Sequence, residues 1–375
     1  MTIEPGPDAG TLTIDLDALG ANWRRLAADA RDRACAAVVK ADAYGIGIEA
    51  AVPALARAGC RTFFVAHLSE GLRVLRTCRE ASVYVLGGFQ PGAAGALVAA
   101  GLRPVLNGAE EVAEWIAACG GAALPCALHV DTGMSRLGLP VEEALAMRAE
   151  GALAALGTPL LMTHLVSAEA PQAPVNAAQI AAFARLTQAF EGWPTSFANS
   201  SGIYLAGAPA CDLARPGYAL YGGNPTPGAA NPMRAVVRLE TPILQVREVS
   251  AGEGAGYGST WIAPGPRRLA TIALGYADGY PRAASGTDAK ARAGVAAGMA
   301  LVGGVRCPFV GTVSMDLVIL DVTDAPPESV RRGEAVVLIG DGLEIDEVGA
   351  RAGTIGYEIL TSLGRRYRRV FRGGG

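Results

Sequence analysis

The chain has 375 residues, of which 51% are hydrophobic and 18% are charged, and its formal net charge at pH 7 is −3. This length and this share of hydrophobic residues predict two or three domains with sizeable packed cores. The weak net charge gives no indication that nucleic acid or an anionic membrane is a partner.

The seven cysteines argue against both a disulfide framework and a zinc site, because their number is odd and no C-x-x-C pair occurs. No bound metal is therefore expected. The polar N-terminus, rich in Pro and Gly, lacks the apolar stretch of a signal peptide. No apolar run is long enough to span a bilayer. These features predict a soluble cytoplasmic protein.

Lysine is almost absent, since only Lys40 and Lys290 stand among 32 basic residues. Lysine can become a nucleophilic amine when its pKa falls, whereas arginine stays charged. Lys290 lies in a polar, Ala- and Gly-rich stretch and is interpreted as a surface residue in a loop. Lys40 ends an apolar run and is the candidate for chemistry.

From Asp15 to about Arg33 the apolar spacing predicts a helix, and short apolar runs then alternate with amphipathic segments. The predicted strands cover approximately 35–40, 62–67, 82–87, 103–106, 126–131, 160–164, 195–198 and 212–215. Helical patterns between them include 48–58, 69–78, 108–118, 141–150 and 176–190. Such alternation indicates parallel strands covered by helices, and eight repeats favour a (β/α)8 TIM-like barrel over an open doubly wound sheet.

A barrel places catalytic groups at the carboxyl ends of its strands. The polar residues at those predicted ends are Lys40, His67, Asn107, Asp131 with Arg136 just beyond it, His164, Asn199 with Ser200, and Arg215. Any one of them could be an ordinary strand-to-loop transition. A lysine, two histidines and two arginines together predict a convergent site.

After about Arg234, runs rich in Val, Ile and Leu recur without helical spacers, which predicts a mostly β C-terminal domain. The runs are 236–249, 268–275, 308–313, 317–322 and 335–339, and the segment from Glu344 to Phe371 is partly helical in pattern. We therefore expect a barrel over 11–234 and a β-rich domain over 235–375. Residues 1–10 are expected to be flexible or packed on the C-terminal domain.

Seven motifs then occur in the order found in one enzyme family. They are VVKADAYG around Lys40, DTGMSRLG around Arg136, RPGY at Arg215, GYG around Tyr257, GYADG at Tyr276, GTVSMD ending after Met315, and YE at Tyr357. Together they strongly resemble the alanine racemases, which depend on pyridoxal phosphate. The resemblance covers nearly the whole chain and implies a barrel followed by a β domain, working as a homodimer with composite active sites.

The resemblance implies that Lys40 binds pyridoxal phosphate covalently, because the cofactor aldehyde requires an amine. It also implies that Tyr257 of the partner subunit is the second base of a racemase that interconverts L- and D-alanine. This reaction supplies D-alanine for peptidoglycan. A cationic neighbourhood should help the phenol to ionise, since its ordinary pKa is near 10.

The remaining roles also follow from the resemblance. Arg215 is expected to donate to the ring nitrogen of the cofactor without giving up its proton, and His164 to connect Arg215 to the catalytic tyrosine. Arg136, the backbone amide of Met315 from the partner, and Tyr276 are expected at the substrate, with Tyr276 and Tyr357 narrowing the entrance. The cofactor phosphate is expected to contact Tyr44, Ser200, Gly217, Tyr218 and Tyr357.

One position departs from the common pattern of the family. Many members have a carbamylated lysine seven residues before the arginine, where this chain has His129. We therefore expect no carbamate here. Three anchors for Arg136 remain open: His129 acting through water, a bound anion such as chloride, or another residue.

Alternative functions remain at this stage. The chain could be a racemase of serine or of a broader set of small amino acids. It could be a basic-amino-acid decarboxylase of the same two-domain plan, although such enzymes usually present a carboxylate to the ring nitrogen. It could also be a non-catalytic protein that binds pyridoxal phosphate, although such proteins have the barrel alone.

Overall fold

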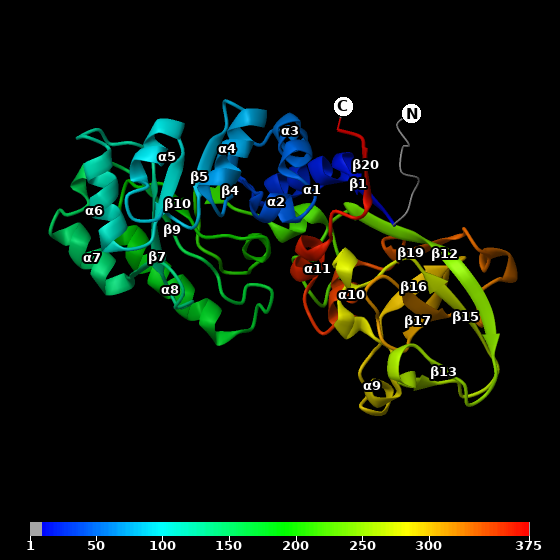
Figure 1. Ribbon diagram of the computed structural model, residues 1–375. Coiled ribbons are helices and arrows are strands. Elements are labelled where there is room, and N and C mark those ends of the chain that lie inside the picture. Colours follow the sequence, from blue (N-terminus) through cyan, green and yellow to red (C-terminus); the bar gives the residue numbers. More distant parts are fainter. Residues whose placement is uncertain (1–9, 375) are drawn as a thin grey trace, which may run out of the picture. The chain divides into compact units, whose positions relative to one another are not determined.

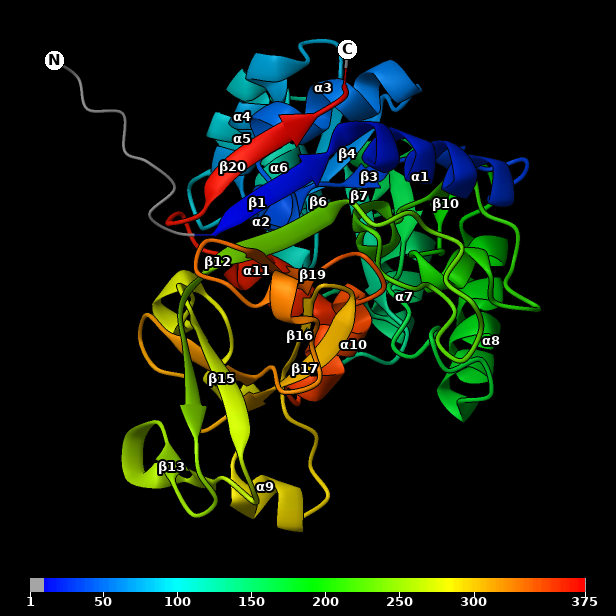
Figure 2. The ribbon, with the colours of Figure 1, turned by 90° about the vertical axis from the view of Figure 1, so that its right-hand side faces the viewer.

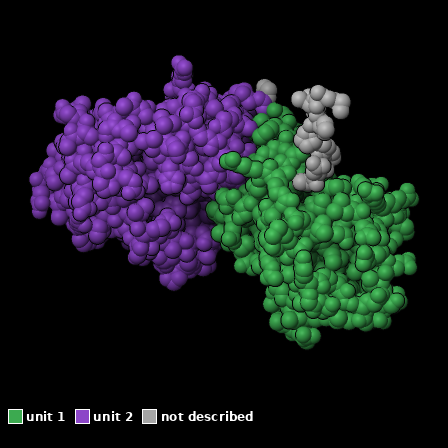
Figure 3. Space-filling model, viewed as in Figure 1, with its two compact units in different colours: residues 1–16, 235–373 green, residues 17–234, 374–375 purple. Residues whose placement is uncertain are grey.

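The computed structural model describes residues 10–374, which divide into two compact units after Leu16 and again after Arg234 (Figure 3). One unit is the α/β barrel, over 17–234. The other is β-rich and contains 235–373 together with the segment that ends at Leu16. The expected placement of residues 1–9 lies outside the described part of the chain.

The α/β unit alternates strands and helices along the chain (Figure 1). Its strands are β2 (Ala34–Cys35), β3 (Ala37–Val38), β4 (Thr62–Val65), β5 (Ser82–Val85), β6 (Arg103–Leu106), β7 (Ala127–Asp131), β8 (Leu139–Pro140), β9 (Leu160–Met162), β10 (Thr195–Ser196) and β11 (Leu213–Ala214). Its helices are α1 (Leu16–Asp29), α2 (Lys40–Tyr44), α3 (Ile48–Ala58), α4 (Leu68–Thr77), α5 (Ala94–Ala100), α6 (Ala109–Ala118), α7 (Val141–Ala149) and α8 (Pro174–Ala189).

Seven of these strands form a parallel ladder in the order β3-β4-β5-β6-β7-β9-β10, with β8 beside β7. Backbone hydrogen bonds close the ring. The amide of Arg215 donates to Ala198 O at 2.8 Å, and the amide of Ala36 donates to Ala214 O at 2.9 Å. The strand at 213–214 therefore joins the last strand of the ladder to the segment that leads into the first. The sequence prediction of a (β/α)8 fold is confirmed.

The barrel interior is apolar, as the predicted strands require. Val39, Phe63, Phe64, Leu106, Leu128 and Leu161 are completely buried. The strands are short because each contributes only the few residues that cross this core, and covering helices begin within a few residues of most strand ends. Helix α5, in the Ala- and Gly-rich stretch after residue 91, was not among the predicted helices.

The β-rich unit is built around one long strand, β12 (Val237–Val249). The other strands are β1 (Thr11–Asp15), β13 (Gly254–Ala255), β14 (Trp261–Ile262), β15 (Arg267–Ile272), β16 (Met299–Val302), β17 (Val305–Val310), β18 (Val318–Asp321), β19 (Ala335–Ile339) and β20 (Arg368–Arg372). Its helices are α9 (Asp288–Arg292), α10 (Ile345–Arg351) and α11 (Gly356–Ser362). Because β12 pairs with β19 at one end and β15 at the other, the order β12-β15-β18-β17-β16-β19 returns to β12 and closes a second barrel.

Strand β1 belongs to this β-rich unit, whereas the sequence placed residues 11–16 with the α/β barrel. Residues Thr11 to Ile14 pair antiparallel with β12, and Thr11 to Asp15 pair parallel with β20 (Figure 2). The pairing partners lie more than two hundred residues further along the chain, so a local pattern could not reveal them.

The isolated lysine Lys290 has a structural role within the β-rich unit. It lies on α9, and its ammonium donates to the backbone carbonyls of Ala283 and Ser285. This lysine therefore fastens the loop that precedes its own helix.

The side chain of Asn22 fastens α1 to the end of the α/β unit. It is buried, and its Nδ2 donates to Leu220 O at 3.1 Å and to Arg234 O at 2.9 Å. Its Oδ1 accepts a hydrogen bond from the amide of Arg234 at 2.8 Å. One side chain thus satisfies three backbone groups that are distant in sequence.

We expect Asn22→Ala to destabilise the protein by about 2–4 kcal/mol, because it leaves buried backbone groups without partners. Thermal unfolding, followed by circular dichroism, should show a lower midpoint than the wild type. The control is Arg24→Ala, two positions along the same helix, which removes an exposed side chain and should leave the midpoint almost unchanged. Equal midpoints for both variants would contradict this role of Asn22.

Candidate active site

Lys40 stands at the carboxyl end of β3, where it is the first residue of the short turn α2. Within residues 10–374, no group forms a hydrogen bond or an ion pair with its ammonium. Burial, and then the nearby positive charge of Arg136, lower the pKa of Lys40, while Glu70 acts in the opposite direction. The amine is thus free of protein partners and is biased towards its neutral form.

The charges around His164 show which strand ends converge. Burial and then, in decreasing order, the positive charges of Arg215, Lys40 and Arg136 together lower the pKa of His164 to about 3. These groups come from the ends of strands β3, β7, β9 and β11. The barrel therefore brings Lys40, Arg136, His164 and Arg215 into one site, with the histidine neutral at pH 7.

Arg215 is buried, with 4% of its surface exposed, and two groups from neighbouring strands hold it. One guanidinium nitrogen donates to Thr163 O at 2.6 Å, and the other donates to Ser196 Oγ. No carboxylate of the described residues pairs with Arg215. Burial lowers the pKa of this guanidinium to about 10, so it remains protonated at neutral pH. Nothing in the sequence singled out Thr163 and Ser196 except that they are polar residues inside apolar runs.

A second cluster, of hydroxyl and amide groups, lies beyond strands β10 and β11. Ser200 Oγ accepts hydrogen bonds from the amides of Gly217 at 3.0 Å and Ala219 at 3.3 Å. A Cβ at position 217 would collide with the hydroxyl of Tyr44. Glycine is therefore required there, and it lets the backbone approach the Tyr44 hydroxyl closely. Tyr218 is buried beside this cluster and packs closely against the backbone of Gly223.

These two clusters fit the cofactor that the sequence resemblance implied. The unpaired Lys40 amine suits the aldehyde, and the buried Arg215 without an acidic partner suits a neutral ring nitrogen. The region of Ser200, Gly217 and Tyr44 suits a phosphate, in the part of a (β/α)8 barrel where phosphates usually bind. By contrast, no group of His, Cys, Asp or Glu within residues 10–374 could hold a metal ion.

The backbone between Lys40 and Tyr44 is strained. Four successive residues that are not glycine, Ala41 to Tyr44, have φ values of 52° to 55°. The left-handed conformation costs an L-residue on the order of 1–2 kcal/mol. Such strain persists only where the surroundings enforce it, and it is concentrated at functional sites.

Arg136 is exposed, and none of the described residues hydrogen-bonds to it or forms an ion pair with it. The neighbouring Asp131 is not its anchor, because that carboxylate accepts from the amides of Gly133, Met134 and Ser135. His129 is buried, and its Nδ1 lies 2.9 Å from Asn107 Oδ1. Burial lowers the pKa of His129 to about 4, so this side chain is neutral at pH 7 and is paired with an amide. A direct acidic partner of Arg136 is thus absent from residues 10–374.

The other polar residues predicted at strand ends stabilise the local structure. His67 is exposed and precedes α4 as its N-cap residue. Asn107 pairs with His129 and also donates to Val105 O at 2.8 Å, while Asn199 Oδ1 accepts from the amide of Gly202. These residues were candidates in the sequence, but their bonds are local or structural.

The site residues expected in the β-rich unit are unusually exposed for apolar or aromatic side chains; Tyr357 lies in α11, and the others lie in short turns and loops between strands. Tyr257 is 77% exposed, and Tyr276, Met315 and Tyr357 are also exposed. Three of these loops pack together. The amides of Tyr276 and Ala277 donate to Ser314 O and Met315 O at 3.0 Å, and a Cβ at Gly311 would meet Ala255 O beside the Tyr257 loop. The unit thus presents Tyr257, Tyr276 and Met315 from adjacent loops.

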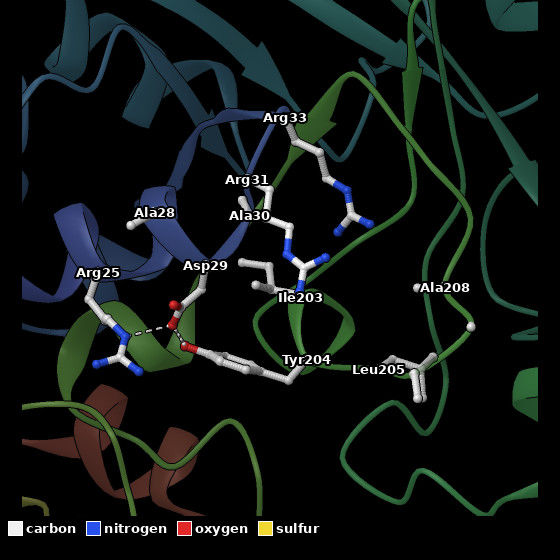
Figure 4. A pocket seen from close by; sticks show the side chains of 12 residues that line it. Arg25, Ala28, Asp29, Ala30, Arg31, Arg33, Ile203, Tyr204, Leu205 and Ala208 are labelled. Carbon is white, nitrogen blue, oxygen red and sulfur yellow. Dashed lines mark hydrogen bonds and ion pairs between the residues drawn. The ribbon is translucent and has the colours of Figure 1, made fainter.

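A separate cavity of about 520 Å³ lies at the opposite, amino end of the barrel strands (Figure 4). Arg25, Arg31, Arg33, Asp29 and Tyr204 line it, and the Tyr204 hydroxyl donates to Asp29 Oδ2 at 2.7 Å. This cavity lies before strands β2 and β11, whereas Lys40 and Arg215 follow β3 and β11. It is therefore not part of the site around Lys40.

Comparison with known proteins matches both parts of the chain to one family. The family model for the N-terminal domain of alanine racemase matches residues 14–225, and the model for its C-terminal domain matches 236–371. The chain is 63% identical over 362 residues to an alanine racemase of Methylobacterium nodulans, with 96% of this chain and 95% of that protein covered. It is 59% identical to one of Methylobacterium sp. over 97% of this chain and 98% of the other.

Among solved structures, one similar chain is the alanine racemase of Bartonella henselae with covalently bound pyridoxal phosphate. It has a TM-score of 0.90 and 37% sequence identity, and the comparison covers 98% of this chain and all of the other. Because both domains match, the decarboxylase and barrel-only alternatives are set aside. The chain belongs to the alanine racemase family.

Proposed function

We propose that this alanine racemase uses two bases, with Lys40 moving the proton on one face of the substrate α-carbon and Tyr257 on the other. Family membership establishes the reaction, the interconversion of L- and D-alanine, and the cofactor, pyridoxal phosphate. The observation that supports the residue roles is the Lys40 amine without a protein partner, beside Arg136, His164 and Arg215.

When bound, pyridoxal phosphate supplies the electron sink that stabilises negative charge at the α-carbon. The chain supplies the proton transfers and the positioning. Burial and Arg136 lower the pKa of Lys40, which favours the neutral amine that can accept a proton. Arg136 itself has a free guanidinium, which is suited to the substrate carboxylate because its donors match carboxylate oxygens.

The second base is proposed to come from the partner subunit of a homodimer. Support comes from the β-rich unit, whose loops expose Tyr257, Tyr276 and Met315 to an extent that packing within that unit does not explain. Exposed aromatic and Met side chains on adjacent loops are typical of surfaces that associate. In this proposal the amide of Met315 holds the substrate carboxylate, and Tyr276 with Tyr357 limits the size of the substrate side chain.

In this proposal Arg215 donates a hydrogen bond to the ring nitrogen of the cofactor. His164 connects Arg215 to the catalytic tyrosine, Tyr257. A guanidinium that is buried and fixed by Thr163 O and Ser196 Oγ can donate a hydrogen bond but keeps its proton. Tyr44, Ser200, Gly217, Tyr218 and Tyr357 hold the phosphate. The proposed cellular role is the supply of D-alanine for peptidoglycan.

The proposed location is the cytoplasm. Its support is that all seven cysteines are free thiols, which suits a reducing compartment. Among the described residues, no helix is both long and apolar enough to cross a membrane.

The two-base proposal predicts that Tyr257→Phe lowers racemisation by about 10²–10⁴-fold, because one of the two proton transfers loses its base. L-Alanine and D-alanine should be incubated separately with the enzyme in deuterated water, with α-deuterium and chirality followed together. The variant should still exchange the α-proton of one enantiomer, through Lys40. The wild type should place deuterium in both.

The matched control is Tyr204→Phe, which removes a hydroxyl at the amino end of the barrel and should leave the rate almost unchanged. If Tyr257→Phe racemises alanine at the rate of the wild type, the tyrosine is not the second base.

The assignment of Arg215 predicts that Arg215→Lys lowers kcat/KM by about 10²-fold. A single ammonium keeps the charge, but it cannot reproduce the planar set of donors that reaches Thr163, Ser196 and the ring. Arg215→Glu should raise the amount of pyruvate formed per racemisation event. A carboxylate favours a protonated ring nitrogen, which draws the negative charge of the α-carbon into the ring and so favours transamination, the side reaction that yields pyruvate. Thermal unfolding of each variant checks that it is folded.

The control for this pair is Arg185→Lys, which alters an exposed ion pair with Glu142 on the outer helices. An unchanged ratio of pyruvate to racemised alanine in a folded Arg215→Glu variant would mean that Arg215 does not set the protonation of the ring.

A further inference from the structure

The left-handed turn between Lys40 and Tyr44 connects two of the proposed cofactor-binding residues. Ala41, Asp42 and Ala43 have φ and ψ close to 50°, and Tyr44 continues the positive φ. Within the turn, the amide of Gly45 donates to Ala41 O at 2.8 Å, and the amide of Ala43 donates to Val39 O at 2.9 Å. Since L-residues disfavour this conformation, groups outside the turn must hold it.

Glu70 is the first of these groups. It lies in the first turn of α4, and its Oε2 accepts from the amides of Ala66 at 2.8 Å and His67 at 3.3 Å. Its Oε1 accepts from the amide of Asp42 at 3.3 Å. One carboxylate thus ties the end of β4 and the start of α4 to the middle of the turn.

Asp42 and Arg73 provide the second attachment. Asp42 Oδ1 accepts from the amide of Ile48 at 3.1 Å and from Arg73 Nη2 at 2.6 Å. Arg73 also donates to both carboxylate oxygens of Glu49, at 2.7 Å from Nε and 2.5 Å from Nη2. The turn is therefore bound to both α3 and α4.

The conformation of the turn determines where Lys40 and Tyr44, the residues at its two ends, lie relative to each other. Lys40 precedes it at the end of β3, and Tyr44 ends it as a buried residue whose ring stacks on Tyr221 with centroids 4.5 Å apart. The Tyr44 hydroxyl lies against Gly217 in the proposed phosphate region. A turn that relaxed to the right-handed form would move Tyr44 relative to Lys40, because four successive residues would rotate about their backbone bonds.

We propose that Glu70, acting with Asp42 and Arg73, is a positioning residue that holds the turn left-handed and so fixes the distance between the Lys40 amine and the Tyr44 hydroxyl. The proposal rests on the assignment of both residues to the cofactor. It adds to that assignment three side chains outside the cofactor contacts.

The charge of Glu70 gives it a second, smaller effect. It raises the pKa of Lys40 and opposes the burial and the Arg136 charge that lower it. Removing Glu70 could thus alter the enzyme through the turn or through the charge. A test must separate these routes.

The main variants are Glu70→Ala and Arg73→Ala, and the control is Glu142→Ala, which breaks the exposed ion pair between Arg185 and Glu142 at 2.9 Å. Cofactor affinity and the visible circular dichroism of each bound cofactor are measured in holoenzyme without alanine. We expect Glu70→Ala to weaken affinity about tenfold and to reduce the dichroism per bound cofactor. It should lower kcat by roughly 10- to 100-fold with little change in KM, since a small misplacement has effects of that size.

A second substitution distinguishes the effect of Glu70 on the conformation of the turn from the effect of its charge on Lys40. Ala41 is exposed, and glycine adopts positive φ without steric cost, so Ala41→Gly removes part of the penalty that Glu70 offsets. In the Glu70→Ala background, Ala41→Gly should restore affinity and dichroism by roughly fivefold, a factor that corresponds to the relief of one strained residue. A residue that acted only through its charge would not be rescued.

If Glu70→Ala does not fold, Arg73→Ala carries the test, since Arg73 is partly exposed and its guanidinium, within residues 10–374, pairs with the carboxylates of Asp42 and Glu49 alone. Unchanged affinity and dichroism in the folded variants, or no recovery with Ala41→Gly, overturns the proposal. Because these readouts need no alanine, they stay distinct from a failure of the two-base proposal, which would show in the wild type as exchange without racemisation.

Discussion

The closure of the parallel barrel is the constraint on which the active site depends. The segment 212–216 hydrogen-bonds on one side to the strand at 195–196 and on the other to the chain leading into Lys40, as in the bond from Val38 N to Pro216 O at 2.9 Å. Lys40 and Arg215 come from the two ends of the α/β unit in sequence. They become neighbours only because the last strand of the ring meets the first. The carboxyl ends of parallel strands all open on one face, so the same closure adds His164 and Arg136.

The resulting site carries positive charge that the protein does not neutralise. Among the described residues, Lys40 and Arg136 have no hydrogen-bonding partners, and Arg215 is held by a carbonyl and a hydroxyl. Burial first, and the nearby positive charges second, lower the pKa values of His164 and His129, so neither histidine adds to this charge at pH 7. This charge gives the site a preference for anions, which suits the proposed binding of an anionic cofactor and a substrate carboxylate. A carboxylate from the protein beside Arg215 would remove this preference.

Two kinds of support keep these groups in place. Arg215 donates hydrogen bonds to the backbone carbonyl of Thr163, just after β9, and to the Ser196 hydroxyl in β10, and these acceptors orient its guanidinium. Carboxylates on the first turns of the covering helices, above all Glu70, hold the strained segment after Lys40. Helix N-termini favour carboxylates, and strand ends leave amides that need acceptors, so the βα junction suits such a residue. The β-rich unit makes a different contribution, because closely packed glycine-containing loops direct Tyr257 and Met315 outward.

The sequence alone determined the fold class, most of the elements and the family, and it supplied the candidate site residues. Alternation of apolar runs with amphipathic helices is a local signal, and the strand over 335–339 and the helix over 48–58 have the predicted bounds. The scarcity of lysine singled out Lys40, and ordered motifs identified the family.

Tertiary structure decided what depends on contacts between distant residues. The sequence assigned β1 to the wrong unit because its partners are at 237–240 and 368–372. The sequence could not reveal that Asn107 pairs with His129, or that Arg215 donates to Thr163 O and Ser196 Oγ. It also could not reveal that the Glu70 carboxylate accepts a hydrogen bond from the turn after Lys40. It also could not show that four ordinary residues there are left-handed, because neither alanine nor tyrosine favours that conformation. Periodicity reports which face of an element is buried, whereas these features depend on which elements meet.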